Sequence, residues 1–287
     1  LVMSLSLVTV ANASDFSDDA DISYKEAVDV MTAIGVIDGM DDGSFDPNGT
    51  LTREQAAALI CRMMLGKDGA EKLNTTYAPF DDVAATRWSA PYIAYCVEQG
   101  YIVGESTTTF NPTGKLTGHA FAKLLLCVLG YDPIIETYTG ASWAVNVATD
   151  AVSAGIAVDG MLMGNEISRE EAAQMAFQAL EADMVRYSSK GTNIELENGV
   201  IINTGASDPE RVDNAQANDY RGRTDGDVYM QFCEQYFEDL TKTSAGSDDL
   251  GRPASEWSYD GDDIGTYAED ADDVMVINPD DGATFAN

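Results

Sequence analysis

The sequence is poor in the residues that most catalytic centres require. It has one histidine, His119, and contains no Ser-His-Asp, HExxH, P-loop or GxGxxG pattern. A single imidazole leaves few groups for acid–base chemistry near neutral pH. Paired carboxylates are common, but in so acidic a chain they do not single out a glycosidase. We therefore expect a protein that is not an enzyme, with no catalytic residues and no cofactor.

Basic residues are also scarce, with 16 lysines and arginines against 49 acidic residues and a net charge of −33. A surface of this sign repels phosphate backbones and anionic lipid headgroups. This argues against nucleic acid and membrane surfaces as partners. Residues 188–287 carry 23 acidic and 6 basic residues, so about half of the net charge lies in the last third of the chain.

Long hydrophobic runs are confined to the N-terminus. The first 13 residues are mostly apolar and end in Ala11-Asn12-Ala13, as in the apolar region and cleavage site of a signal peptide. We interpret residues 1–13 as a signal peptide remnant; a short buried strand or helix start is the alternative. The run is too short to span a bilayer, and we expect an exported mature chain without membrane insertion.

The four cysteines and the acidic turns show no metal-ligand spacing. Three cysteines lie in apolar helical runs, where a free thiol behaves as a small hydrophobic group. Disulfides remain an alternative in an exported protein. The aspartates at 38, 41, 42 and 46 do not fit the spacing of an EF-hand loop, so we expect no metal site and calcium-independent function. The cysteines are Cys61, Cys96, Cys127 and Cys233.

An internal repeat is the main feature that is present. Residues 35–52 and 100–117 match at a constant offset of 65, and both open on a Gly-x-x-x-Gly stretch that is followed by a Phe-x-Pro turn and a Leu-Thr pair. Such a repeat indicates that one supersecondary unit is used several times. Helical periodicity flanks each loop and predicts helices over 24–34, 53–65, 88–99 and 118–129. A weaker third unit predicts helices over 143–154 and 169–180.

Helix caps and turn signals refine this organisation. Thr52 with Gln55, and Ser168 with Glu171, have the spacing of capping boxes at helix starts. Near the C-terminus, the Asn198-Gly199 pair within residues 193–203 predicts a β-hairpin. Residues 229–240 have helical spacing, and the segment from residue 251 indicates short strands and turns.

These motifs resemble S-layer homology (SLH) repeats. The first unit shows Phe16-Ser17-Asp18, residues 42–47 and Leu51-Thr52-Arg53-Glu54; the second shows residues 80–83, Trp88 and the Phe-x-Pro loop; the third keeps Trp143, Gly155 and residues 167–170. The resemblance implies SLH repeats at 14–68, 78–131 and 132–186, the last one divergent. It implies a mainly α fold of three helix-loop-helix repeats in a pseudo-threefold bundle. We expect a small acidic α+β domain of unknown role at 190–287.

The resemblance also implies a function and a location. It implies non-covalent anchoring of an exported protein to the bacterial cell wall, through anionic, pyruvylated secondary cell-wall polysaccharide bound in grooves between repeats. The expected location is the cell wall or S-layer at the cell surface, and self-assembly into a surface layer is left open. Two alternatives are a wall-anchored polysaccharide-degrading enzyme with a C-terminal catalytic part, and a dockerin-like protein-binding module.

Two arginines are the leading candidates for glycan contact. Arg53 and Arg169 match the arginine of the Thr-Arg-Ala-Glu motif of the SLH family, and a guanidinium pairs with a carboxylate in two hydrogen bonds. Both would stand at the positive end of a helix dipole. The second repeat has Gly118-His119 here instead, so we expect its site to be degenerate. The other candidates are Asp18, Asp82, Trp88, Trp143, Gly39 and Gly104.

Each candidate has a structural alternative. The arginines could pair with nearby acidic residues, the tryptophans could pack in the core, the aspartates could cap helices, and the glycines could serve turn geometry.

Overall fold

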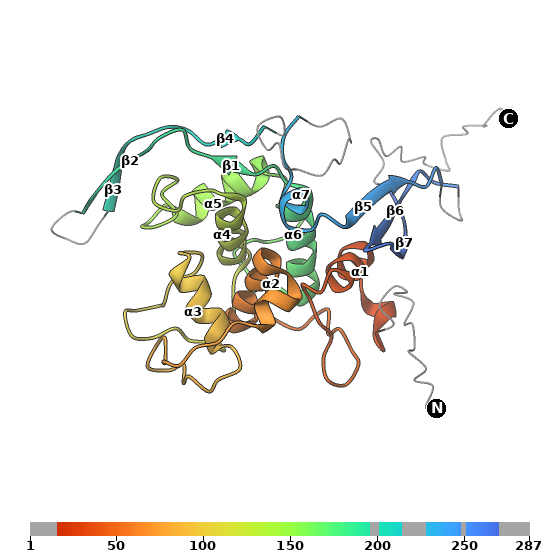
Figure 1. The fold of residues 1–287 in the computed structure, drawn as a ribbon, viewed down its shortest axis with the longest axis horizontal. Coiled ribbons are helices and arrows are strands. Elements are labelled where there is room, and N and C mark those ends of the chain that lie inside the picture. Colours follow the sequence, from red (N-terminus) through yellow and green to blue (C-terminus); the bar gives the residue numbers. More distant parts are fainter. Residues whose placement is uncertain (1–15, 196–200, 214–227, 248–250, 270–287) are drawn as a thin grey trace, which may run out of the picture.

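The computed structural model describes residues 16–195, 201–213, 228–247 and 251–269. The signal-peptide prediction for residues 1–13 lies outside them. Six helices form three helix-loop-helix units along the chain (Figure 1). The first unit follows a 3-10 turn, η1 (Asp19–Asp21), and contains α1 (Lys25–Ala33) and α2 (Arg53–Glu71). The second contains α3 (Ala90–Glu98) and α4 (Gly118–Leu129), and the third α5 (Trp143–Ser153) and α6 (Arg169–Glu181).

The second helix of each unit begins at a side-chain cap. Thr52 and Gln55 form the capping box of α2, and Ser168 and Glu171 form that of α6, as their spacing predicted. Each box satisfies backbone N–H groups that would otherwise lack partners at the first turn. Helix α2 runs past its predicted end at residue 65, but Gly66 interrupts it with φ +68° and produces a kink.

A ring of three backbone hydrogen bonds joins the units just before these helices. The amide of Leu51 donates to the carbonyl of Ile167 (3.0 Å), that of Leu116 to Leu51 (3.1 Å), and that of Ile167 to Leu116 (2.9 Å). All three side chains are buried. The ring brings the N-termini of α2, α4 and α6 together, so each unit's second helix starts against the loop of another unit.

The strands form three small antiparallel sheets in the described part of the chain. In the first, β1 (Val185–Arg186) pairs with β4 (Glu210–Arg211). In the second, β2 (Lys190–Glu195) pairs with β3 (Ile201–Ala206), which confirms the strands of the predicted hairpin; its Asn-Gly turn lies outside the described residues. In the third, β5 (Leu240–Ser244), β6 (Ala254–Tyr259) and β7 (Asp262–Ala268) lie in that order. The helix predicted over 229–240 is only α7 (Phe232–Tyr236).

The predicted mainly α fold is wrong. The structure is 35% helix and 20% strand, with seven helices and three small sheets among the described residues. The hairpin strands were predicted, but the helix predicted over 229–240 shortens to α7 and is followed by β5. Helical periodicity in the repeats dominated the prediction and gave the strands too little weight.

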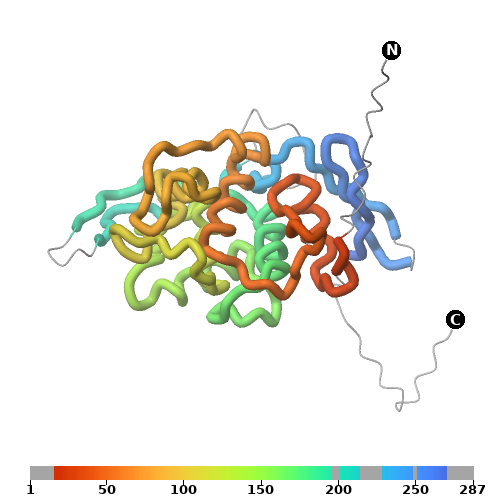
Figure 2. The backbone as a smooth tube through the Cα atoms, turned by 90° about the horizontal axis from the view of Figure 1, so that it is seen from below, coloured from red at the N-terminus to blue at the C-terminus, as the bar shows by residue number. Residues whose placement is uncertain are grey.

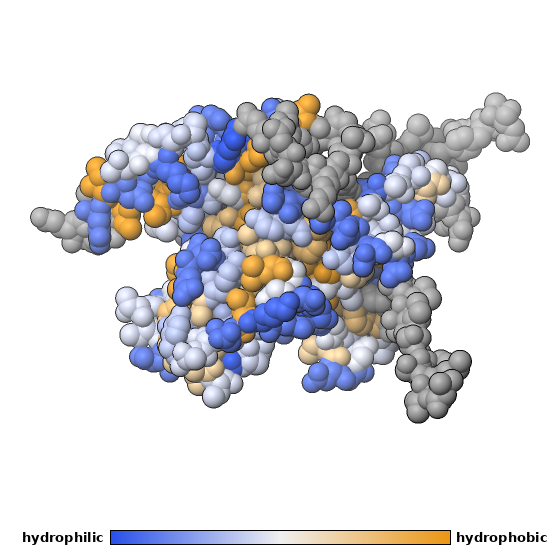
Figure 3. Space-filling view, viewed as in Figure 1, coloured by the Kyte–Doolittle hydropathy of each residue, from blue (hydrophilic) through white to orange (hydrophobic). Residues whose placement is uncertain are grey.

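One hydrophobic core connects the helical units with the C-terminal sheet. Trp257 of β6 is fully buried, its ring lies edge-on to Phe177 of α6 at 5.5 Å, and its Nε1 donates to Glu26 of α1 (2.7 Å). Tyr267 of β7 donates its hydroxyl to Asp29 of α1 (2.7 Å). Figures 1 and 2 accordingly show β5–β7 beside α1, whereas β2 and β3 project from the helical body. Hydrophobic residues on the face in Figure 3 gather near its middle, over α2.

The cysteines lie inside this core and are free. Cys61 and Cys96 face each other across α2 and α3 with their sulfur atoms 3.6 Å apart. Burial raises the pKa of Cys127 to about 12, which makes its thiolate inaccessible at neutral pH. Among the described residues, no group of histidines, cysteines and acids has the geometry to hold a metal ion, and no helix is long and apolar enough to cross a bilayer.

Candidate functional site

Two cavities lie between the helical units, and each contains one of the two candidate arginines. The first, here called the Arg169 cavity, has a volume of about 710 Å³. The loop after α1 and one face of α2 form its walls, and Trp88 and Arg169 complete it. Its lining residues are 36–42, Leu51, Gln55, Ala58, Leu59, Arg62, Trp88, Arg169 and Ala172.

The second cavity, here called the Arg53 cavity, has a volume of about 560 Å³. The loop after α3, one face of α4 and the loop before α5 enclose it, with Trp143 and Arg53 at its edge. The two cavities are equivalent in the repeat, because each combines an arginine from one unit, a glycine-containing loop from the next and a tryptophan from the one after. Its lining residues are Arg53, 100–103, Leu116, Ala120, Lys123, Leu124, Pro133, Ile134, Tyr138, Thr139 and Trp143.

Arg53 spans two units through backbone contacts. Its Nε donates to the carbonyl of Phe110 and its Nη2 to that of Val103, both at 2.8 Å. The guanidinium carbon stands 4.5 Å from the centre of the Phe110 ring, a cation–π contact. Burial lowers the pKa of Arg53, and the nearby carboxylates of Glu105 and Asp82 oppose this shift without a direct salt bridge. A guanidinium has five N–H donors, so several remain for a ligand.

Arg169 repeats this geometry at the other cavity. Its Nε donates to the carbonyl of Phe45 (2.8 Å) and its Nη2 to that of Asp38 (3.1 Å), and it lies 5.0 Å from the Phe45 ring centre. Burial lowers the pKa of this guanidinium as well. Like Arg53, it forms no ion pair with a described carboxylate. Both arginines are thus partly desolvated cations that make no direct salt bridge among the described residues, and only carboxylates at a longer distance stabilise their charge.

The two aspartates hold the loops on which the arginines rest. The Asp18 carboxylate accepts the amides of Phe45 (2.7 Å) and Asp46 (2.8 Å), and the Phe45 amide in particular lowers its pKa. Asp82 accepts the amides of residues 110 and 111 in the same way. These bonds stabilise the left-handed backbone of Asp46 (φ 58°) and of its counterpart in the second unit. Neither aspartate lines a cavity.

Of the four tryptophan and glycine candidates, both tryptophans and one glycine line a cavity, and the other glycine does not. Trp88 lines the Arg169 cavity with 55% of its surface exposed, and the half-buried Trp143 lines the Arg53 cavity. Gly39 also lines the Arg169 cavity, and a Cβ atom there would lie 2.5 Å from the Phe16 ring. Gly104 lies outside the Arg53 cavity; a Cβ atom there would lie 2.4 Å from the Ser106 carbonyl. Packing of the backbone therefore requires both glycines.

The equivalent position of the second unit has no room for an arginine. A Cβ atom on Gly118 would lie 2.4 Å from the methyl carbon of Met161 and 3.0 Å from the backbone of Met163. The amide of His119 donates to the carbonyl of Met163 (2.9 Å), and its ring packs edge-on to Trp143. The loop of the third unit thus lies directly on the start of α4.

Sequence reasoning missed two cations at the cavities. Arg62 lines the Arg169 cavity and pairs with Asp38 at 2.6 Å. Lys123 lines the Arg53 cavity, where Ala58 of the first unit is its counterpart at the 65-residue offset. An alignment of α2 with α4 at this offset would have indicated that the second unit has a lysine where the first has an alanine.

Comparison with known proteins places this geometry in a family context. Residues 15–57 and 79–122 match the S-layer homology domain, and the match does not extend to the third unit. The chain is 36% identical to an endoglucanase of Bacillus sp. (strain KSM-635) over 137 residues, which cover 45% of this chain and 15% of that protein. It is 29% identical to the surface-layer 125 kDa protein of Lysinibacillus sphaericus over 217 residues, covering 70% of this chain and 18% of the relative.

A third relative is the middle cell wall protein of Brevibacillus brevis, which is 25% identical over 177 residues. That match covers 62% of this chain and 16% of the relative. The chain therefore spans less than a fifth of the length of these three relatives.

Proposed function

We propose that this chain anchors a larger protein to the bacterial cell wall by non-covalent binding of an anionic secondary cell-wall polysaccharide. Its location is the cell wall or cell surface, which the two S-layer homology matches and the surface-layer relatives support. The proposed ligand carries carboxylates, as pyruvylated sugars do, and binds in the two cavities between units. The described residues act in binding and not in catalysis.

One observation carries this proposal. Arg53 and Arg169 are partly desolvated, lie at equivalent places in two cavities, and form no direct salt bridge with a described carboxylate, although carboxylates nearby act on their pKa. Burying an unpaired charge costs free energy unless a ligand neutralises it. In a chain of net charge −33, two such cations indicate sites for anions. Trp88 and Trp143 beside them offer flat apolar surfaces for sugar rings.

The third unit is part of the proposed binding module as a divergent SLH repeat. Its residue Ile167 completes the ring of backbone hydrogen bonds formed with the two matched units, and Arg169 reproduces the contacts of Arg53. The Arg169 cavity consequently needs the third unit. We further propose that residues 190–287 form an accessory region on this module, and that self-assembly into a surface layer is compatible with it.

Cosedimentation with purified cell walls tests the proposal. The full chain should bind intact walls and not walls stripped of secondary polysaccharide. Arg53→Gln and Arg169→Gln should each weaken binding about tenfold, the loss of one or two charge-assisted hydrogen bonds, and the double variant should abolish it. Arg211→Gln, on the exposed strand β4, is the control for loss of one positive charge and should bind as the wild type does. Unchanged binding by the double variant would refute the cavity assignment.

Two further experiments distinguish wall anchoring from a dockerin-like module and from an enzyme. Binding should persist in a chelator, whereas a dockerin-like module would lose it. Turnover of labelled wall glycans by the chain would favour the enzyme alternative, to which the endoglucanase relative lends some support.

A further inference from the structure

The two cavities differ in charge although they are equivalent in the repeat. The lining of the Arg53 cavity includes two cations, Arg53 and Lys123, and no aspartate or glutamate. The lining of the Arg169 cavity includes two arginines and three aspartates at positions 38, 41 and 42. One of its arginines, Arg62, is already paired with Asp38. The Arg53 cavity therefore presents net positive charge, and the Arg169 cavity does not.

Lys123 lies on a helix of a strongly acidic protein but pairs with no acidic residue among those described. It is half-buried on α4, and its Nζ donates to the backbone carbonyl of Tyr138 at 2.9 Å. No carboxylate among the described residues pairs with it, and burial lowers its pKa. Even partial removal of an ammonium group from water is costly, and an anionic partner offsets that cost. Arg53 in the same cavity also makes no direct salt bridge with a described carboxylate, although Glu105 and Asp82 oppose the lowering of its pKa from nearby.

The remaining wall of the Arg53 cavity is apolar and aromatic. Tyr101 and Trp143 face it from two units, and Pro133 and Ile134 close it from the loop before α5. A few charged groups set in an apolar wall are typical of sites that hold and orient a small ligand. This combination suits a carboxylate attached to a compact apolar group and a sugar ring, as in a pyruvyl ketal.

We propose that the Arg53 cavity is the anion-selective one of the two, and that Lys123 is its second cation, which pairs with a ligand carboxylate together with Arg53. The Arg169 cavity, where three aspartates offset the two arginines, would then bind the anionic groups of the same glycan less selectively. This inference rests on the proposed function, since it assigns parts of the wall polysaccharide to individual cavities.

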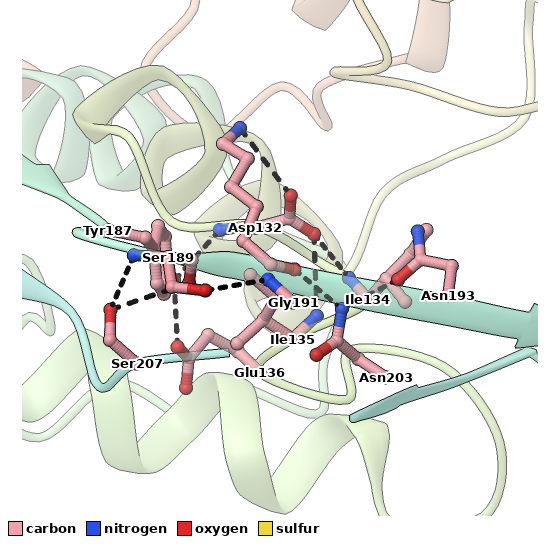
Figure 4. Close-up of polar contacts among 11 residues, drawn as sticks. Asp132, Ile134, Ile135, Glu136, Tyr187, Ser189, Gly191, Asn193, Asn203 and Ser207 are labelled. Carbon is pink, nitrogen blue, oxygen red and sulfur yellow. Dashed lines mark hydrogen bonds and ion pairs between the residues drawn. The ribbon is translucent and has the colours of Figure 1, made fainter. Parts of the chain in front are cut away.

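The loop that forms one wall of the Arg53 cavity is fixed by the start of the β region. Tyr187 donates its hydroxyl to Glu136 (2.7 Å) and accepts the amide of Asp132 (3.0 Å), and the Asp132 carboxylate accepts the amide of Ile134 (3.0 Å). Figure 4 shows these contacts at the base of the β2–β3 ribbon. Tyr138, whose carbonyl holds Lys123, lies on the same loop. The position of Lys123 is therefore set before ligand binds.

Calorimetric titration with three small probes tests the assignment on the full chain. The probes are the methyl glycoside of a pyruvylated N-acetylaminosugar, its carboxylate methyl ester, and the same glycoside without the ketal. The wild type should bind the acid at least tenfold more tightly than the ester. Lys123→Met should lose about tenfold for the acid and little for the other two probes, and Lys123→Arg should bind the acid nearly as the wild type does. Arg211→Gln, the control for loss of one positive charge, should leave acid binding unchanged, and Arg169→Gln should weaken it less than Arg53→Gln does.

Ala120, one turn before Lys123 on α4 and also in the lining, provides a second and isosteric pair of variants. Ala120→Glu should place a carboxylate beside the two cations and abolish binding of the acid probe, whereas Ala120→Gln should retain it. Lys123→Met should resist denaturant at least as well as the wild type, because it removes an unpaired, partly desolvated charge. A lysine with a purely structural role would instead destabilise the fold when replaced.

The outcomes separate this inference from the proposed function. Equal acid binding by Lys123→Met and the wild type, or equal binding by the two Ala120 variants, would overturn the role of Lys123 while wall binding stands. A loss of acid binding in Arg169→Gln as large as that in Arg53→Gln would overturn the division between the cavities. Selective acid binding without cosedimentation on walls would support the pocket and refute the anchoring function.

Discussion

At the scale of the residue, the second position of each long helix connects one unit to the next. Glu54 of α2 accepts hydrogen bonds from Nε and Nη2 of Arg87, both at 2.7 Å, and from Ser89 at the start of α3. Glu170 of α6 accepts the backbone amide of Ser23 before α1 (2.7 Å). In α4 this position is His119, which contacts Trp143 through its ring. The lone histidine thus replaces an anchoring carboxylate by an aromatic contact.

We expect Glu54→Gln to lower the free energy of unfolding by about 2 kcal/mol at pH 7, because a buried carboxylate that accepts charge-assisted bonds is replaced by an amide. Burial opposes ionisation of Glu54, but Arg87 and Ser89 together lower its pKa. Its stabilising effect is therefore present above the unfolded-state pKa of about 4.3 and is lost as the pH falls through the folded-state value.

Urea denaturation of Glu54→Gln and wild type between pH 3 and 7 measures this effect. The difference between the two proteins should shrink toward the acid end. Glu166→Gln is the matched control, since its pair with Lys115 is exposed on both sides and should contribute less than about 0.5 kcal/mol. A pH-independent difference would show that the charge of Glu54 contributes nothing.

At the scale of the element, loop length decides which units can form a cavity. The loop of the third unit is about four residues shorter than those of the first two and lacks the Phe-x-Pro turn. Its Asn165 carbonyl accepts the amide of Gly118 (3.1 Å), and Met161 covers the helix start. The space that an arginine side chain occupies in the other two interfaces is filled by this loop.

We expect Gly118→Ala to destabilise the protein by about 2 kcal/mol, even though alanine is the better helix former, because the added methyl group would overpack against the backbone of Met163. Gly164→Ala in the same loop is the control, since its Cβ atom would meet only the His119 ring at 4.0 Å. Thermal unfolding of the two variants compares them directly. Equal melting temperatures would mean that the loop moves aside readily, and that an arginine at 118 could restore a third site.

At the scale of the whole molecule, the C-terminal sheet is attached to the first and third units. Trp257 packs against Phe177 of α6 and hydrogen bonds to Glu26 of α1, and the Asp29 side chain, which Tyr267 contacts, is inaccessible to solvent. Segments more than 200 residues apart in the chain therefore share one core. We infer that the sheet and the helical units unfold together.

We expect Trp257→Ala to cost about 4 kcal/mol, the usual loss when a fully buried tryptophan is truncated, and to shift the unfolding of the helices as much as that of the sheet. Trp257→Phe should retain most of the packing and lose about 1 kcal/mol with the bond to Glu26. Far-UV circular dichroism and tyrosine fluorescence should follow a single transition in every variant. Two separate transitions would show that residues 190–287 form an independent domain.

Local features of the sequence were sufficient to predict much of the helical architecture. The capping boxes at Thr52 and Ser168, and the helices that follow them, depend on residues within one or two turns of each other. The strands of the hairpin were likewise predicted from a local turn signal. The mainly α assignment failed because β5–β7 are stabilised by contacts with α1, which no local pattern reveals.

The sequence by itself determined the repeat, the starts of its helices, the acidic surface and the two arginines as candidate cations, since each is a matter of spacing or composition. Only the tertiary structure decided that Arg53 and Arg169 lie in cavities without a direct salt bridge to a described carboxylate, that Asp18 and Asp82 hold loops, and that Lys123 lines the same cavity as Arg53. Those properties depend on which unit lies against which. That arrangement follows from the ring of hydrogen bonds among Leu51, Leu116 and Ile167, residues that are far apart in the chain.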